Sequence, residues 1–249
     1  MDTPYAVPLL IVVGCVAGIL NVLAGGGSFL TLPVLIFLGL PPTAANGTNR
    51  VGIFLQNVSA VWSFRRLGVL ETGTAPWTVL PAVAGSGLGA WLSLSIGDEA
   101  FQRILAFLMV VVSLWTLWSS GPKDEARQAT AARWQTAVGF FAAGIYGGFV
   151  QAGVGFLILA VTTAAGLDLV RGNAVKVQAI LALTALALAV FAWQGRVDWW
   201  LGLCLAVGTM VGGYLGAKLT VLKGHRWVRR VVTATVVVFA VKLWWSAGG

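Results

Sequence analysis

Charged residues are scarce in this sequence. Only 10% of its 249 residues are Asp, Glu, Lys or Arg, whereas about a quarter of a typical soluble domain is charged. Because 58% of the residues are hydrophobic, a soluble domain of this length could not bury its apolar surface. The alternation of apolar and polar residues that marks the strands of a membrane β-barrel is also lacking. Continuous apolar runs predict instead an all-α polytopic membrane protein.

Catalytic and metal-binding motifs are lacking as well. The chain has one histidine, and its two cysteines, Cys15 and Cys204, lie in apolar segments without the spacing of a metal site or a disulfide framework. No GxSxG, HExxH or Walker A sequence is present, and no carboxylate falls in the middle of a predicted span. We therefore expect no enzyme, no cofactor and no bound metal. A membrane-embedded hydrolase or transferase is kept as an unfavoured alternative.

The basic residues occur mostly in short loops between apolar segments. The net charge of +8 therefore follows from the tendency of cytoplasmic loops to be positive, and it predicts no nucleic-acid partner. Arg65-Arg66, residues 121–133 and residues 223–230 are expected to face the cytoplasm. The N-terminus lacks the basic start and cleavage pattern of a signal peptide, so we expect the first apolar segment to be retained.

Eight apolar segments approach the roughly 20 residues that a membrane span needs. They cover residues 5–24, 43–64, 75–96, 101–120, 134–151, 169–193, 199–221 and 227–245. Shorter apolar pieces, 29–38 and 156–165, follow the first segment of each set of four. A shift of 127 positions aligns residues 26–46 with 153–173 at eight of 21 positions. The pattern predicts a single transmembrane domain, 1–249, with a first repeat at 1–120, a cytoplasmic linker at 121–133 and a second repeat at 134–249.

The positions of the basic loops also predict how the repeats are oriented. For residues 121–133 and 223–230 to share the cytoplasmic side, residues 134–165 must enter the membrane and return to the side from which they came. We therefore expect each glycine-broken segment to form a hairpin within the membrane, or two crossings. The halves are then inverted, with three or four spanning helices each and both termini outside. A single crossing at each break would make the repeats parallel and place residues 223–230 outside.

Glycines interrupt the first apolar segment of each half. Residues Ala24 to Ser28 read AGGGS, and residues Gln151 to Gly155 form a looser version of the same break. A helix that restarts at such a break has unpaired N–H groups and a positive dipole end, with Ser28 available as its N-cap. Two such helix starts meeting near the middle of the membrane would form one anion site. The alternative is that the glycines only permit close helix packing.

Polar residues begin the long segment after each break. A buried cation in each half would complement an anion, since charge is costly to hold in lipid without a role; snorkelling to the interface is the alternative. Gln56 and Asn57 lie further along and either line the same path or bond between helices. The expected substrate-binding residues are Gly25, Gly26, Gly27, Ser28, Asn46, Thr48, Asn49, Arg50, Gln151, Gly153, Gly155, Asn173 and Lys176.

Several ordered motifs resemble the TauE/SafE family of bacterial sulfite exporters and organosulfur-anion permeases. Residues 21–28 match its N-x-x-A-G-G-G-S break, residues 33–42 its P-x-L-x-x-x-G-x-P-P turn, and residues 46–49 its N-A-T-N helix start with Gly47 in place of alanine. Residues 144–181 resemble the second break and the R-x-N-A-x-K helix start, although Gln151 stands where glycine is common. Residues 197–219 resemble a later helix that ends in G-G-Y-x-G-A-[KR].

The resemblance implies a function and a location. A member of this family is expected to be a multi-pass secondary transporter of the bacterial inner membrane that moves sulfite or an organosulfonate, as an exporter. Its partners would be a small anionic substrate and the lipid bilayer, with a homodimer left open. An anion channel of the same architecture is the alternative: stoichiometric coupling to protons would favour the transporter, and passive flux that follows the voltage would favour the channel.

Overall fold

The computed structural model describes residues 5–70, 73, 75–118 and 131–222. All regular elements in these residues are helices, which confirms the all-α class. In chain order they are α1 (Ala6–Leu23), α2 (Ser28–Phe37), α3 (Pro42–Arg66), α4 (Ala75–Ser95), α5 (Asp98–Trp118), α6 (Arg133–Phe149), α7 (Val154–Ala164), α8 (Leu169–Trp193) and an unlabelled helix, Trp199–Leu222. The predicted span at 227–245 and most of the predicted linker lie outside the described residues.

The helices differ in whether they can span a membrane. Four of the described helices are long and apolar enough to do so: α1, α4, α8 and Trp199–Leu222. The helices α2 and α7 have only 10 and 11 residues. At about 1.5 Å per residue they are roughly half as long as the hydrocarbon layer is thick. These short helices match the predicted pieces at 29–38 and 156–165, and neither can span the bilayer alone.

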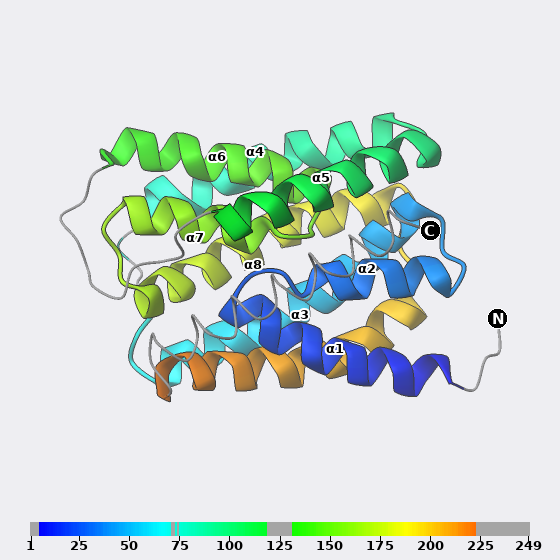
Figure 1. Cartoon of the computed structure of the whole chain (residues 1–249), viewed down its shortest axis with the longest axis horizontal. Coiled ribbons are helices and arrows are strands. Elements are labelled where there is room, and N and C mark those ends of the chain that lie inside the picture. Colours follow the sequence, from blue (N-terminus) through cyan, green and yellow to red (C-terminus); the bar gives the residue numbers. More distant parts are fainter. Residues whose placement is uncertain (1–4, 71–72, 74, 119–130, 223–249) are drawn as a thin grey trace.

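Each glycine break reverses the direction of the chain. Figure 1 shows α2 running back beside α1, and α7 running back beside α6. The long helices α3 and α8 then cross the bundle in opposite directions. Gly47 near the start of α3 packs against Phe191 near the end of α8, and Phe64 near the end of α3 shares a core cluster with Ala174 near the start of α8. The α3–α8 pair therefore forms an antiparallel seam through the middle of the molecule.

Two other helix pairs touch at the level of the backbone. A Cβ atom on Gly89 of α4 would overlap the carbonyl oxygen of Ile145 in α6. A Cβ atom on Gly208 of the Trp199–Leu222 helix would likewise overlap the carbonyl oxygen of Ile11 in α1. Small residues let helices in membranes approach this closely, and the gain is van der Waals contact rather than burial from water. The glycines therefore let α4 pack closely on α6, and Trp199–Leu222 on α1.

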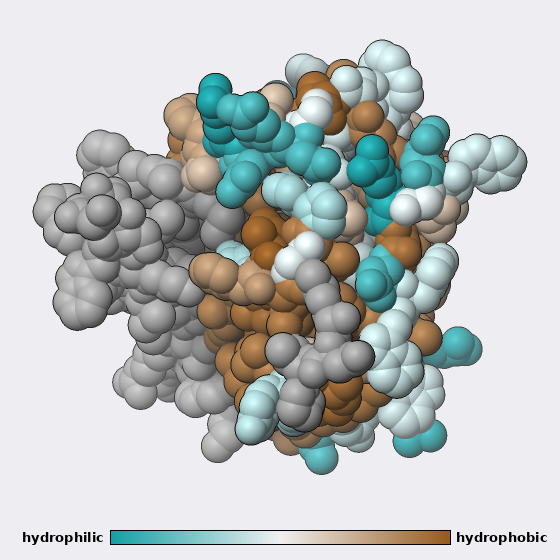
Figure 2. Space-filling view, turned by 90° about the vertical axis from the view of Figure 1, so that its right-hand side faces the viewer, coloured by the Kyte–Doolittle hydropathy of each residue, from teal (hydrophilic) through white to brown (hydrophobic). Residues whose placement is uncertain are grey.

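Apart from the buried Arg50 and Lys176, the charged side chains named here lie at the two ends of the bundle. The end formed by the close of α3 and the starts of α6 and α8 carries Arg65, Arg66, Arg133 and Arg171. Two arginines there stack on tryptophans, since Arg66 lies 3.9 Å from the ring centre of Trp62 and Arg133 lies 4.7 Å from that of Trp77. The opposite end, shown in Figure 2 with its polar residues gathered over the upper part, carries Asp98, Glu99, Arg103, Arg196 and Asp198.

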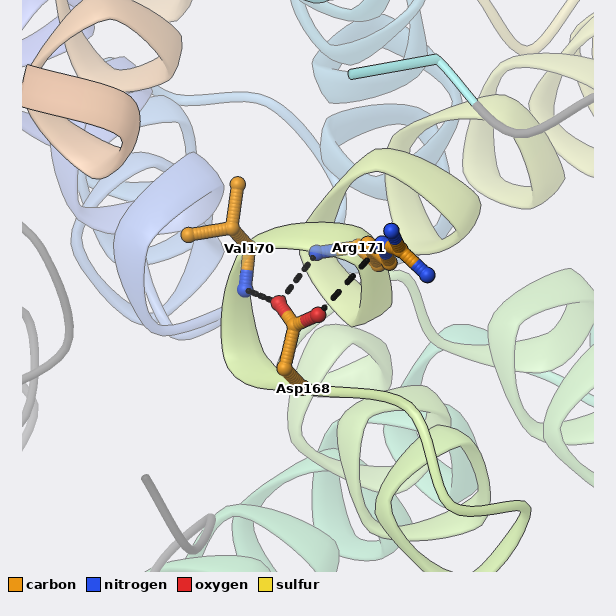
Figure 3. Close-up of polar contacts among 3 residues, drawn as sticks. All are labelled: Asp168, Val170 and Arg171. Carbon is orange, nitrogen blue, oxygen red and sulfur yellow. Dashed lines mark hydrogen bonds and ion pairs between the residues drawn. The ribbon is translucent and has the colours of Figure 1, made fainter. Parts of the chain in front are cut away.

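The helix α8 begins with a side-chain cap (Figure 3). The Oδ1 atom of Asp168 accepts hydrogen bonds from the backbone N–H groups of Val170 at 2.9 Å and Arg171 at 3.0 Å. Its Oδ2 atom lies 3.5 Å from Nε of Arg171. Because the first N–H groups of a helix have no partner within the helix, this aspartate satisfies two of them.

Asp168→Ala is therefore expected to lower the free energy of unfolding by about 1 kcal/mol. Asp168→Asn is the matched control, because the asparagine side-chain oxygen can accept the same two hydrogen bonds. Thermal unfolding of the purified protein in detergent would compare the two variants with the parent chain. An equal loss in both would show that the cap itself contributes little.

Candidate functional site

The two glycine breaks meet in the interior of the bundle. Gly25 and Gly153 have φ angles of 98° and 78°, in the left-handed region that glycine adopts without strain. A Cβ atom on Gly155 would overlap the Cα atom of Gly25, so the two backbones are in direct contact. This contact places the start of α7 against the loop that leads into α2. The breaks are adjacent although they are separated by more than a hundred residues.

A small polar cavity lies at this contact. Its volume is about 10 Å³, and residues of both breaks, of α3 and of α8 line it. The lining consists of Asn21, Gly25, Ser28, Ile53, Gln56, Asn57, Gln151, Val154, Gly155 and Ile180. A cavity of this volume holds about one water molecule. The cavity is therefore too small to hold an oxyanion, which can enter only after its walls move apart.

The polar side chains around the cavity bond to one another across the breaks. Nδ2 of Asn21 donates to Oε1 of Gln56 at 3.1 Å, and Nε2 of Gln151 donates to the hydroxyl of Thr184 at 3.2 Å. Asn57 donates to the carbonyl group of its own helix at residue 53, and its Oδ1 atom has no hydrogen-bond partner among the described residues. The cavity is thus lined by neutral amides and by Ser28 and Val154, the first residues of α2 and α7.

Arg50 lies beside this cavity and binds the end of α6. The side chain is completely buried. Its Nη1 atom donates to the carbonyl oxygen of Gly147 at 3.0 Å and to Oε1 of Gln151 at 2.9 Å, and its Nη2 atom donates to the carbonyl oxygen of Gly148 at 2.5 Å. The last carbonyl groups of a helix have no partner within the helix, and the helix dipole makes that end negative. Arg50 of α3 is therefore a C-terminal cap for α6.

Lys176 makes the corresponding contacts with α1. Its buried Nζ atom donates to the carbonyl oxygens of Asn21 at 3.1 Å and Val22 at 2.7 Å, and to Oδ1 of Asn173 at 2.5 Å. An ammonium group has three N–H donors, and these three contacts account for all of them. Lys176 of α8 is therefore a C-terminal cap for α1.

The two caps are reciprocal and carry uncompensated charge. Arg50 belongs to the first half of the chain and binds α6 of the second, whereas Lys176 belongs to the second half and binds α1 of the first. Within the described part of the chain, neither cation forms an ion pair with a carboxylate. Only dipoles compensate the two positive charges, so the region around the cavity has a positive potential.

The residues predicted from the sequence fall into three groups. Gly25, Ser28, Gln151 and Gly155 line the cavity, and Gly26, Gly27 and Gly153 lie in the breaks without lining it. The third group, Asn46, Thr48, Asn49, Arg50, Asn173 and Lys176, is buried. All of them except Asn173 bond to another segment of the chain, whereas Asn173 accepts from Lys176 within α8. In this group Asn46 donates to the carbonyl oxygen of Phe149, Asn49 accepts from Thr31, and Thr48 accepts from the backbone of Asp198.

Some details differ from expectation. Gly27, rather than Ser28, stands at the N-cap of α2, and the Ser28 side chain makes no capping bond. Four lining residues, Asn21, Ile53, Val154 and Ile180, had no role assigned from the sequence. Asn21 had a detectable signal, since it is a polar residue in an otherwise apolar segment. The three apolar residues had none, because an apolar side chain facing a cavity has the same sequence pattern as one facing the core.

A bundle of apolar helices in which two broken helices meet at a central polar cavity is the architecture of a helical membrane transporter. The chain belongs to the sulfite exporter TauE/SafE family, whose sequence profile matches residues 10–243.

The similar proteins are described as transporters. A probable membrane transporter protein of Haemophilus influenzae is 30% identical over 244 residues, covering 96% of this chain and 95% of its own length. The probable membrane transporter protein YfcA of Escherichia coli K12 is 27% identical over 252 residues, covering 100% of this chain and 93% of its own length. No solved structure matches the chain. The family and these relatives agree on membrane transport, and the relatives' descriptions name no substrate.

Proposed function

We propose that the chain is a secondary transporter that moves a small anion, sulfite or an organosulfonate, outward across the bacterial inner membrane. The observation that carries this proposal is the contact of the two glycine breaks at a polar cavity. The starts of α2 and α7 supply N–H groups and positive dipole ends there, an arrangement suited to an anion. The description of the family as sulfite exporters supports both the class of substrate and the direction.

An inverted repeat of segments 1–120 and 134–249, joined at 121–133, is part of the proposal. The helices α1 to α4 have 18, 10, 25 and 21 residues, and α6, α7, α8 and Trp199–Leu222 have 17, 11, 25 and 24. Corresponding helices run in opposite directions in Figure 1. A shift of 127 residues takes Gly47 to Ala174 and Phe64 to Phe191. The contact of Gly47 with Phe191 therefore corresponds to the contact of Ala174 with Phe64. Such reciprocity supports two halves related by a pseudo-twofold axis.

The orientation in the membrane follows from the charged ends. The end that carries Arg65, Arg66, Arg133 and Arg171 would face the cytoplasm, because basic residues accumulate on that side. The first described helix, α1, then begins at the outer face (Figure 1). This arrangement supports a hairpin at each glycine break rather than a single crossing.

In the proposed mechanism, the anion occupies an enlarged form of the cavity. The N–H groups at the starts of α2 and α7 hold it, together with the hydroxyl of Ser28 and the side-chain amides of Asn21, Gln56 and Gln151. The nearby charges of Arg50 and Lys176 stabilise the anion electrostatically. The small cavity supports alternating access over a channel, since its walls must move apart before an anion can occupy it.

Anion binding to the purified protein in detergent tests the proposal. Sulfite, sulfate, thiosulfate, sulfoacetate, taurine and acetate would be compared by calorimetry, with Ser28→Ala and Ser93→Ala as matched variants. Both serines are buried, but only Ser28 lines the cavity. We expect saturable binding of a sulfur oxyanion that Ser28→Ala weakens about tenfold, the effect of one hydrogen bond to a charged group, and that Ser93→Ala leaves unchanged. Failure of every sulfur oxyanion to bind, or equal loss in both variants, would contradict the proposal.

A further inference from the structure

We propose that Arg50 and Lys176 are the two gate residues of this transporter, each closing one side of the cavity by holding together two groups of helices that separate during transport. The inference rests on the proposed transport function. It adds which helices move, and which contacts must break for the site to open to each side.

The first group of helices, called unit A, consists of α1, α2, α3 and Trp199–Leu222. The last of these helices touches α1 through the backbone at Gly208 and at Gly212. It is also bonded to α3, where the hydroxyl of Thr209 donates to the carbonyl oxygen of Gly52 at 2.8 Å and the hydroxyl of Ser59 donates to that of Met210 at 2.7 Å. Backbone contact with α1 and hydrogen bonds to α3 make these helices one packed body.

The second group, called unit B, consists of α4, α6, α7 and α8. Backbone contact joins α4 to α6 at Gly85, Gly89, Gly144 and Gly148. The hydroxyl of Ser86 in α4 donates to the carbonyl oxygen of Leu183 in α8 at 3.0 Å. Each unit thus takes its fourth helix from the other half of the sequence. The bodies that move are therefore not the two sequence repeats.

The seam between the units follows α3 and α8, with the cavity midway along it. Because these helices are antiparallel, Arg50 of α3 lies level with Phe191 of α8, at 4.6 Å from its ring centre. Ile53, Gln56 and Asn57 follow Arg50 along α3 and line the cavity opposite Ile180.

Lys176 lies beyond the cavity on its other side. It precedes Ile180 along α8, and its bonds to Asn21 and Val22 place it beside the cluster in which Val22 packs with Ala60 of α3. The two cations therefore flank the cavity. Arg50 lies toward the end of the bundle that carries Asp98 and Asp198, and Lys176 toward the end that carries Arg65 and Arg66.

Both cations bind across this seam. Arg50 of unit A holds Gly147, Gly148 and Gln151 of unit B, and Lys176 of unit B holds Asn21 and Val22 of unit A. Opening the seam on one side breaks the bonds of the cation on that side and preserves those of the other. The freed cation then faces the opening without its carbonyl partners, and an anion that enters there can take their place in a charge-assisted interaction. The substrate anion thereby stabilises the open state, which couples opening to binding.

Thiol labelling from each side of the membrane tests the inference without any substrate. Ile180→Cys, in a background with Cys15 and Cys204 replaced by alanine, places one thiol in the cavity wall, and a membrane-impermeant maleimide is applied to right-side-out and inside-out vesicles. Arg50→Lys weakens the contact of residue 50 with the end of α6, because an ammonium cannot reproduce the guanidinium's fork of donors. Asn173→Ala weakens the contact of Lys176 with the end of α1, because it removes one acceptor of the Lys176 ammonium. Both substitutions keep every positive charge in the seam.

We expect each variant to raise the labelling rate about tenfold from one side only, and the two variants to respond from opposite sides. Arg50→Lys should expose the thiol to the outer face and Asn173→Ala to the cytoplasmic face. Lys176→Met serves as a stronger inner variant with the same expected side. Labelling of both variants from the same side, from both sides, or at the parent rate would overturn the inference. If the two variants are labelled from opposite sides but the parent chain binds none of the tested anions, the roles of Arg50 and Lys176 as gate residues would stand and the proposed substrate class would be rejected.

Discussion

Replacing Gly155 with alanine is expected to abolish anion binding and transport. The added methyl group would overlap the Cα atom of Gly25, and the obstacle is backbone that cannot rotate away as a side chain can. The two breaks would have to separate, which removes the contact that brings the starts of α2 and α7 to one cavity. Overpacking of a close-packed interior costs typically 1–3 kcal/mol, and here the displaced atoms are those of the site itself.

Gly97→Ala is the matched control for this substitution. Gly97 lies in the turn between α4 and α5, where an added Cβ atom would meet no atom within 4 Å, so binding and uptake should be unchanged. Calorimetry with the anion that the parent chain binds, and uptake into proteoliposomes, would measure both variants. Parent-like binding in Gly155→Ala would show that contact of the breaks is not needed to form the site.

Arg50→Met is expected to destabilise the protein more than removal of an exposed arginine does. The substitution removes the guanidinium group that donates to the carbonyl groups of Gly147 and Gly148 and to the side-chain oxygen of Gln151, so these three acceptors lose a partner. A buried polar group that loses its partner costs about 1–3 kcal/mol, so the total is about 3 kcal/mol or more. For a domain of this length a loss of about 3 kcal/mol lowers the thermal midpoint by roughly 6–12 °C.

Arg103→Met is the control. The side chain of Arg103 is 79% exposed and pairs with Glu99 within α5, an arrangement worth about 1 kcal/mol or less. Thermal unfolding of both variants in the same detergent, followed by the circular dichroism of the helices, would compare them. Similar midpoints for the two variants would show that Arg50 does not cap α6 in the membrane protein.

The structure gives the cationic motifs a role that sequence reasoning did not consider. In these two motifs, at residues 46–50 and 171–176, Asn46 and Arg50 bind the end of α6, and Lys176 binds the end of α1, so each binds a helix of the opposite half. A helix that stops inside a membrane leaves carbonyl groups that water cannot reach, so some other element must supply donors. A glycine break within a span therefore requires donors elsewhere in the chain. Here the donors lie near the starts of α3 and α8, the long helices that follow the short helix of each half.

The sequence by itself determined the elements of this protein. Continuous apolar runs predicted helices, the two glycine breaks predicted short helices that match α2 and α7, and the ordered motifs identified the family. These features are local, because helix formation, glycine conformations and span length depend on residues close together in the chain. For the same reason the breaks alone drew attention to Gly25, Ser28, Gln151 and Gly155, which the structure places in the lining of the cavity.

Only the tertiary structure decided which elements meet. It brought Gly25 against Gly155, added Asn21, Ile53 and Ile180 to the cavity, and directed Arg50 and Lys176 to the carbonyl ends of α6 and α1. In a lipid-exposed bundle, apolar faces do not distinguish one neighbour from another, since lipid is as apolar as the helices. Pairing therefore depends on close backbone contact at small residues and on polar groups that need partners. Both require the two surfaces at once, so the sequence of one helix does not specify its partner.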